Sequence, residues 1–242
     1  MMKGAAMEAF FALLNAAYRD IHCFGTHVLT HAPRHWRTND DDWERMRRDF
    51  RRVSREDMFM LRLAFFPMHD GNVHWGVACV YFEHQVVLFY EAWYNRATHT
   101  RWRQACARDV LALLQREWVM TSRMPEDFGE WSLITDPRPA LPVQADGFSC
   151  GLFVCAFALA AANQTTTWLL PKGSNITPFR TYMAACFSAG RILPLAPVKQ
   201  QAQLPPPPAK AGTAGVTQGG SPRKRTSYKA ERADEQYLRR RL

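Results

Sequence analysis

Four residues of this chain carry side chains suited to thiol chemistry: Cys150, His74, Glu91 and Gln144. A thiol nucleophile needs a base that holds it as thiolate, a group that orients that base, and donors for the developing oxyanion. His74 offers the imidazole, and the carboxylate of Glu91 can accept its N–H, fix its tautomer and favour the imidazolium. The side-chain amide of Gln144, six residues before Cys150, suits a second oxyanion donor. These residue types indicate nucleophilic catalysis by a thiol.

A predicted β-hairpin explains how His74 and Glu91 meet. Residues 74–82 (HWGVACVYF) and 86–93 (VVLFYEAW) are rich in branched and aromatic side chains and are separated by three polar residues. His74 begins the first strand and Glu91 lies near the end of the second. Antiparallel pairing therefore places the two side chains roughly opposite each other, about 5 Å apart on one face.

A predicted buried helix explains why Cys150 is the reactive thiol. Residues 150–162 are apolar on all sides, which is typical of a helix buried in a core. Cys150 then lies at the helix N-terminus, where the dipole and free N–H groups stabilise a thiolate and can bind an oxyanion. Gly151 leaves room for the substrate backbone to approach closely.

Other segments have simpler patterns. The spacing of apolar residues predicts helices over 5–20 and 102–118 and helical potential around 43–50, in an otherwise irregular, His-rich stretch from 21 to 55. A strand-like run covers 57–68, and 131–143 reads as a short strand followed by a proline-bounded loop.

The charge of +9 is concentrated at one end of the chain. Residues 199–242 contain ten Lys or Arg and three Asp or Glu, so the preceding part is nearly neutral. This composition predicts a folded domain over 1–195 and a disordered, Pro-rich, basic tail over 196–242. Residues 222–225 (PRKR) fit a nuclear localisation patch, which would bind import receptors, and attraction to nucleic acid is the alternative.

Cysteine usage and hydropathy predict an intracellular protein in the nucleus, the cytoplasm or both. The six cysteines form no CxxC pair, and reduced thiols are the simplest interpretation. Glu8 interrupts the apolar N-terminal stretch, which favours an amphipathic helix over a signal peptide. The longest apolar run, 147–162, is shorter than the roughly 20 residues that span a bilayer, so no membrane association is expected. The oligomeric state is left open.

A second pattern of histidines has a plain interpretation. His27, His31 and His35 recur every four residues, as metal ligands on a helix do, but Pro33 breaks that helix and no acid or cysteine completes a ligand set. We expect a polar loop there, and no metal or cofactor in the chain.

The two chemical motifs together resemble the SUMO protease family of cysteine peptidases, which also includes the adenoviral protease, adenain. The segment VHWGVACVYFEHQVVLFYEAW looks like the His-Trp hairpin of that family, and PVQADGFSCGLFVCAFA looks like its Gln/Cys loop and helix. The resemblance implies an α+β papain-like fold, in which a central mixed or antiparallel sheet packs against a helix that begins at the nucleophile. It also implies cleavage after Gly-Gly, with Trp75 lining a channel that admits only glycine.

Three departures from the family pattern keep alternatives open. The acid is Glu91, which resembles the acid of adenain, whereas the family usually has Asp. Ser149 precedes the nucleophile where Asp is common, and the Trp-Leu element ahead of the first helix is missing. We expect a peptidase that removes or matures SUMO or a related ubiquitin-like modifier through Cys150, His74 and Glu91. The alternatives are an adenain-like protease for a viral or mobile-element polyprotein, or a modifier-binding module with impaired catalysis.

Overall fold

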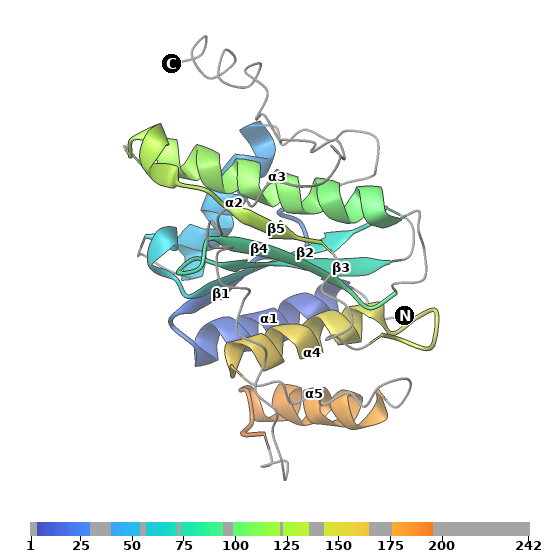
Figure 1. Cartoon of the computed structure of the whole chain (residues 1–242). Helices are drawn as coiled ribbons and strands as arrows, with labels where there is room; N and C mark the ends of the chain where they lie inside the picture. The colour runs from blue at the N-terminus through green and yellow to red at the C-terminus, as the bar shows by residue number, and fades with distance from the viewer. Residues whose placement is uncertain are drawn as a thin grey trace, which may run out of the picture. The chain divides into compact units, whose positions relative to one another are not determined.

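The protein is described by a computed structural model over residues 4–29, 40–53, 57–71, 74–93, 99–121, 123–135, 143–164 and 176–195. All of them belong to one compact unit, Met1–Pro207. Within these residues a five-stranded sheet lies between two layers of helices (Figure 1). The predicted tail over 196–242 lies outside the described residues.

The sheet is mixed, which is one of the two sheet types that the family resemblance implies. Its strands follow each other in chain order: β1 (Ile21–Cys23), β2 (Leu63–His69), β3 (Trp75–Tyr81), β4 (Val86–Glu91) and β5 (Ser132–Ile134). The three central strands pair antiparallel, whereas the short edge strands β1 and β5 run parallel to their neighbours. The predicted hairpin is therefore the centre of the sheet.

Helices cover both faces of the sheet (Figure 1). One face is covered by α1 (Gly4–Ala17) and α4 (Cys150–Ala162), with α5 (Thr177–Ala189) packed on their outer side, and the other face is covered by α2 (Asp40–Val53) and α3 (His99–Met120). Side chains alternate between the layers along β2: Leu63 and Phe65 pack with α1 and α4, whereas Phe66 and Met68 pack with α2 and α3. Burial on both faces explains why these strands are almost entirely apolar.

Several predicted boundaries shift for local reasons. The run over 57–68 divides into a 3-10 turn, η1 (Met58–Met60), and then β2, because the carboxylate of Asp57 accepts the N–H of Phe59 at 3.0 Å and caps the turn. Strand β1 lies in the stretch predicted to be irregular, and its three residues are too short for a period-2 pattern. The second 3-10 turn, η2 (Pro125–Phe128), precedes β5.

Among the described helices, none combines the length and apolarity needed to cross a bilayer.

Gly76 allows α3 to pack closely on the hairpin. It pairs with Glu91 in the β3–β4 register. A methyl group at Gly76 would lie 2.7 Å from Cζ of Phe89 and 3.1 Å from Cη2 of Trp102, both closer than normal contact. Trp102 comes from the first turns of α3, so the missing side chain of Gly76 helps to set the distance between α3 and the end of β4.

We expect Gly76→Ala to lower the free energy of unfolding by roughly 1–3 kcal/mol, because the added methyl overpacks two buried rings. Gly147→Ala is the matched control, since nothing lies within 4 Å of a methyl group there. Urea unfolding followed by fluorescence measures both variants. Equal stability of the two variants would contradict this account of Gly76.

Candidate active site

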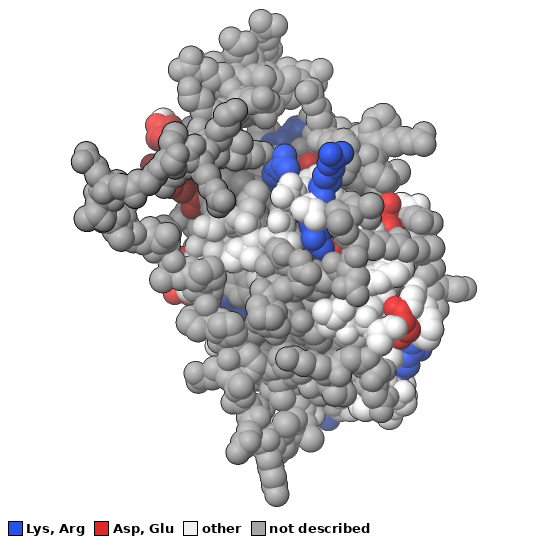
Figure 2. Space-filling view, turned by 45° about the vertical axis from the view of Figure 1, so that its right-hand side comes forward, with Lys and Arg blue, Asp and Glu red and all other residues white. Residues whose placement is uncertain are grey.

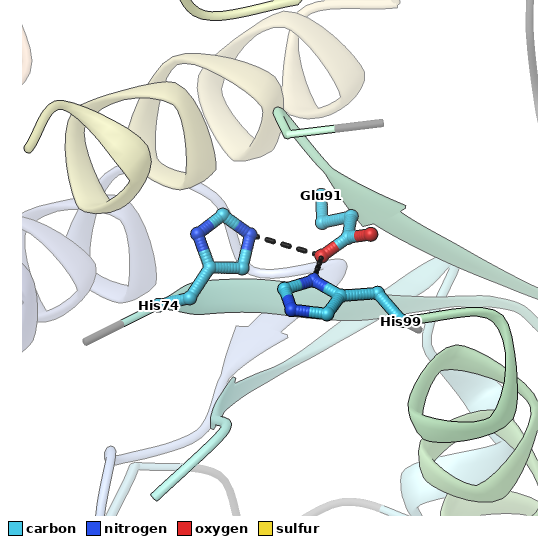
Figure 3. Close-up of side chains that lie close together, drawn as sticks. All are labelled: His74, Glu91 and His99. Atoms are coloured by element: carbon cyan, nitrogen blue, oxygen red, sulfur yellow. Dashed lines mark hydrogen bonds and ion pairs between the residues drawn. The ribbon is translucent and has the colours of Figure 1, made fainter. Parts of the chain in front are cut away.

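Three elements bring His74, Glu91 and Cys150 together. His74 immediately precedes β3, Glu91 ends β4, and Cys150 begins α4. Nε2 of His74 lies 2.9 Å from Oε2 of Glu91 (Figure 3), and the imidazole also hydrogen-bonds with Cys150. Because Nε2 faces the carboxylate, Nδ1 is the ring nitrogen left for the thiol. All three residues are at most 1% exposed.

Backbone pairing of a neighbouring turn fixes where His74 lies. Its N–H donates to Oδ1 of Asp70 at 2.9 Å, and its carbonyl oxygen accepts the N–H of Asp70 at 3.0 Å. The partner of Glu91 across the hairpin is Gly76, so His74 and Glu91 lie diagonally and not directly opposite each other as the sequence predicts. The longer side chain of Glu91, compared with Asp, suits this diagonal reach.

The site favours an imidazolium–carboxylate pair. Burial alone would lower the pKa of His74, but its hydrogen bonds to Cys150 and Glu91 outweigh burial and raise the pKa to about 9. Burial alone would raise the pKa of Glu91, but His74 and His99 outweigh it and hold that pKa below its usual range. His74 is therefore protonated and Glu91 ionised near neutral pH.

Two residues of α3 complete the surroundings of Glu91. Nδ1 of His99 lies 3.0 Å from Oε2, and Nη1 of Arg103 donates to Oε1 at 2.8 Å. Both contacts have ordinary hydrogen-bond lengths, as does the contact of Nε2 of His74 with Oε2 at 2.9 Å. Sequence reasoning missed both residues. The signal available was their four-residue spacing at the start of a helix, which places them on one face.

The cluster of His74, Glu91 and His99 also has the residue types of a metal site. One ligand atom from each lies within 4.8 Å of the others. The charge of Arg103, paired with the same carboxylate, opposes a second cation there. The donor set is therefore better explained as a hydrogen-bonded network.

The loop before the nucleophile is organised by Asp146. Its Oδ1 accepts the N–H groups of Phe148 and Ser149 at 2.9 and 2.7 Å, and its Oδ2 accepts the hydroxyl of Ser149 at 2.7 Å. Nη2 of Arg180 on α5 donates to Oγ of Ser149 at 3.3 Å. These backbone and hydroxyl donors outweigh burial and lower the pKa of Asp146. Ser149, one of the departures from the family pattern, is thus part of an ordered loop.

The remaining predicted residues lie around the same loop. Gln144 is 5% exposed; its backbone N–H donates to the carbonyl of Ala92 at 2.9 Å, and its Nε2 donates to the carbonyl of Asp146 at 2.6 Å. Trp75 is half-buried against His69, with ring centroids 4.6 Å apart, and Gly151 is buried in the first turn of α4. Their roles in oxyanion and substrate binding stay predictions.

The other candidates from the sequence have structural surroundings. His27 lies within ion-pair distance of Glu8 and Asp49, at 3.7 and 3.8 Å, and His31 and His35 lie outside the described residues. All six cysteines are buried and none forms a disulfide, and burial raises the pKa of Cys155 above its usual range. In the view of Figure 2, described basic and acidic side chains are interspersed with uncharged surface.

The chain belongs to the Ulp1 protease family, whose C-terminal catalytic domain matches residues 10–190. This confirms the predicted resemblance to the SUMO protease family of cysteine peptidases. A sentrin-specific protease of Caenorhabditis elegans is 26% identical over 129 residues, which are 52% of this chain and 17% of that protein. The chain thus spans only a small part of that curated relative.

Solved structures confirm the predicted fold class. The Ulp1 protease domain in complex with Smt3, the yeast ortholog of SUMO, superposes with a TM-score of 0.56 at 15% identity, covering 78% of this chain and 76% of that one. The catalytic domain of the Ulp1-like SUMO protease of Chaetomium thermophilum gives 0.51 at 15% identity, covering 78% and 71%. The protein therefore has the α+β papain-like fold of this family.

We expect the alkylation of Cys150 by iodoacetate to slow as the pH rises through about 9, the pKa of His74. The imidazolium persists below that pH because the pKa is raised, and its positive charge attracts the anionic reagent. Inactivation rates between pH 6 and 10, with the modified cysteine located by mass spectrometry, measure the effect. His74→Gln should lose this alkaline limb, and neutral iodoacetamide should not show it. A decrease in the alkylation rate centred at the ordinary pKa of histidine would contradict the raised pKa of His74.

We expect Asp146→Ala to lower turnover about tenfold or more, because the loop before Cys150 loses several hydrogen bonds to one carboxylate. Asp146→Asn, which retains an acceptor oxygen, should lose less. Asp127→Asn, at an exposed position in η2, is the control. Cys150 labelling rates and melting temperatures separate a local effect from unfolding. Unchanged labelling in the folded alanine variant would exclude this role.

Proposed function

We propose that the protein is a thiol peptidase that removes or matures a ubiquitin-like modifier of the SUMO type. The observation that carries the proposal is a single buried imidazole, His74, between the Glu91 carboxylate and the Cys150 thiol. Membership of the Ulp1 protease family supports the substrate class. The yeast neighbour is bound to Smt3, which also supports recognition of a folded modifier.

The geometry supports a two-step acyl transfer. The thiolate of Cys150 attacks the carbonyl carbon of the modifier's C-terminal glycine, and the Gln144 amide and the N–H of Cys150 stabilise the oxyanion. The His74 imidazolium then protonates the leaving amine, which leaves a thioester on Cys150. Neutral His74 takes a proton from water, and the hydroxide adds to the thioester carbonyl. The C–S bond then breaks, Cys150 leaves as a thiolate beside the His74 imidazolium, and the modifier leaves with a carboxyl group that ionises in solvent.

Burial of the nucleophile supports specificity for glycine. Cys150 is 1% exposed and is followed by a glycine without a side chain. An acyl group with no side chain meets the least steric resistance on its way to such a thiol. The half-buried Trp75 and Trp93, whose ring lies 5.7 Å from that of His74, are the aromatic side chains suited to flank a Gly-Gly terminus. Trp93 follows the end of β4 by two residues and is a candidate for a second tryptophan that lines this channel.

The proposal extends to the location and the tail. The modifiers in question are intracellular, so the enzyme is expected in the nucleus, the cytoplasm or both. The basic residues of 196–242 would contact import receptors or nucleic acid, while 1–195 would contain the peptidase.

A second candidate function is processing of a viral or mobile-element polyprotein. The observation that favours it is the acid itself, since Glu91 resembles the acid of adenain. Such an enzyme cleaves short Gly-Gly peptides efficiently without a folded modifier. A third candidate, a binding module with impaired catalysis, rests on Ser149 and on the missing Trp-Leu element.

We expect the purified chain to form a covalent adduct with SUMO that carries a C-terminal electrophile, because Cys150 reacts with the terminal carbonyl position. Parallel reactions with other ubiquitin-like proteins and ubiquitin, read by gel shift and mass spectrometry, give the preference. Cys150→Ala should abolish the adduct, and Cys155→Ala, in the same helix, should retain it.

Three outcomes decide between the candidates. The leading proposal would be wrong if Cys150→Ala still formed the adduct, or if the wild type formed no adduct with any modifier. Fast cleavage of short Gly-Gly peptides with no preference for a folded modifier would favour polyprotein processing. Tight modifier binding with neither labelling nor hydrolysis would favour the binding module.

A further inference from the structure

We propose that His99 and Arg103, in the first turns of α3, are positioning residues that hold the Glu91 carboxylate in the orientation required by His74. This inference rests on the proposed thiol chemistry. Figure 3 shows the imidazoles of His74, just before β3, and of His99, at the start of α3, converging on one oxygen of Glu91. We call His99 and Arg103 the carboxylate clamp.

The clamp holds both oxygens of a fully buried carboxylate. Glu91 is 0% exposed, and the side chain of Arg103 is 3% exposed. Arg103 donates to Oε1 at 2.8 Å, while His99 lies 3.0 Å from Oε2. Nε2 of His74 lies 2.9 Å from the same Oε2, so the two donors on α3 hold the carboxylate with this oxygen facing the imidazole.

The clamp is itself held in place. Nη2 of Arg103 donates to Oγ1 of Thr100 at 3.1 Å, which fixes the guanidinium on its own helix. The ring of His99 lies 5.7 Å from that of Trp102, which packs edge-on against Phe89 at 5.1 Å. The clamp is therefore built on a helix that is packed against the hairpin carrying Glu91.

The clamp also stabilises the charge of Glu91 during turnover. When His74 gives its proton to the leaving amine, the imidazole becomes neutral and no longer offsets the negative charge of Glu91. A buried carboxylate without a positively charged partner has a high free energy. Such a group usually takes up a proton or changes its rotamer. Arg103 stays charged at all relevant pH values, so it keeps Glu91 ionised until His74 is protonated again.

The length of Glu91 gives a second reason for the clamp. A glutamate has one more rotatable bond than the aspartate usual in the family, and its carboxylate has more orientations to choose from. Two donors on a rigid helix remove that freedom. The clamp thus accounts for how a longer acid can orient the imidazole.

The test uses two disruptive variants of the full-length protein and two conservative ones. His99→Phe keeps the ring volume without the donor, and Arg103→Met keeps the aliphatic stem without the charge. His99→Asn restores an N–H near the position of Nδ1, and Arg103→Lys restores the charge. Arg101→Met is the matched control, because Arg101 is exposed on the same turn.

The first readout needs no substrate: the pKa of His74 followed by NMR of the histidine side chains. The charged and titratable groups facing His74 are Cys150 on α4, Glu91 on β4, His69 and Asp70 at the end of β2, and the clamp on α3. Only the clamp changes in this experiment. Removing the positive charge of Arg103 would by itself raise the pKa of His74. A lower pKa of His74 in the Arg103 variant therefore indicates that Glu91 has lost its orientation.

We expect both disruptive variants to lower the pKa of His74 by at least about 1 pH unit, a tenfold loss in proton affinity. They should also reduce kcat at least about tenfold with KM nearly unchanged, because the clamp does not touch the substrate. His99→Asn and Arg103→Lys should recover part of both losses, and Arg101→Met should match the wild type.

A pKa of His74 at or above the wild-type value in folded His99→Phe and Arg103→Met would overturn the clamp, whatever the change in kcat. Melting temperatures identify variants that fail to fold, and for these the conservative pair decides. A small fall in both the His74 pKa and kcat in folded His99→Asn and Arg103→Lys supports the clamp, and wild-type values of both overturn it. If the wild type hydrolyses no modifier, the proposed function fails while the NMR result still decides the clamp.

Discussion

A carboxylate buried without access to water, that of Glu91, constrains the architecture around the active site. Such a group stays ionised only when donors and opposite charge surround it. Here the donors come from β3 and from α3, so the helix must approach the end of the hairpin closely. Gly76 permits that approach, because any side chain there would collide with Phe89 and Trp102.

The site forms where the two helical layers of the domain meet at one end of the sheet. The nucleophile comes from α4, which packs in the layer with α1, whereas the partners of Glu91 come from α3 on the opposite face. His74, at the start of a central strand, lies between them and can contact both. Catalytic geometry therefore depends on the packing of both cores, which explains why a short motif alone does not define it.

The sequence predicts the parts of this arrangement that are local. The hairpin that carries His74 and Glu91 and the buried helix that begins at Cys150 follow from periodicity and turn signals, whereas the type of sheet follows from the family resemblance. The diagonal offset between His74 and Glu91 does not, because it depends on the turn at Asp70. The partnership of Glu91 with His99 and Arg103 also escapes prediction, since it joins β4 to a helix through tertiary packing.

Two of the three departures from the family pattern, Ser149 and Glu91, have a common physical explanation in the structure. Ser149 has no carboxylate of its own, but Asp146, three residues earlier, binds its hydroxyl and the loop N–H groups. Glu91 is longer than the usual acid, and its reach matches the register in which Gly76, not His74, is its backbone partner. In both cases a change in one side chain is accommodated by donors or acceptors a few residues away. A substitution within the motif is thus weak evidence for lost activity when the surrounding contacts still fix the same groups.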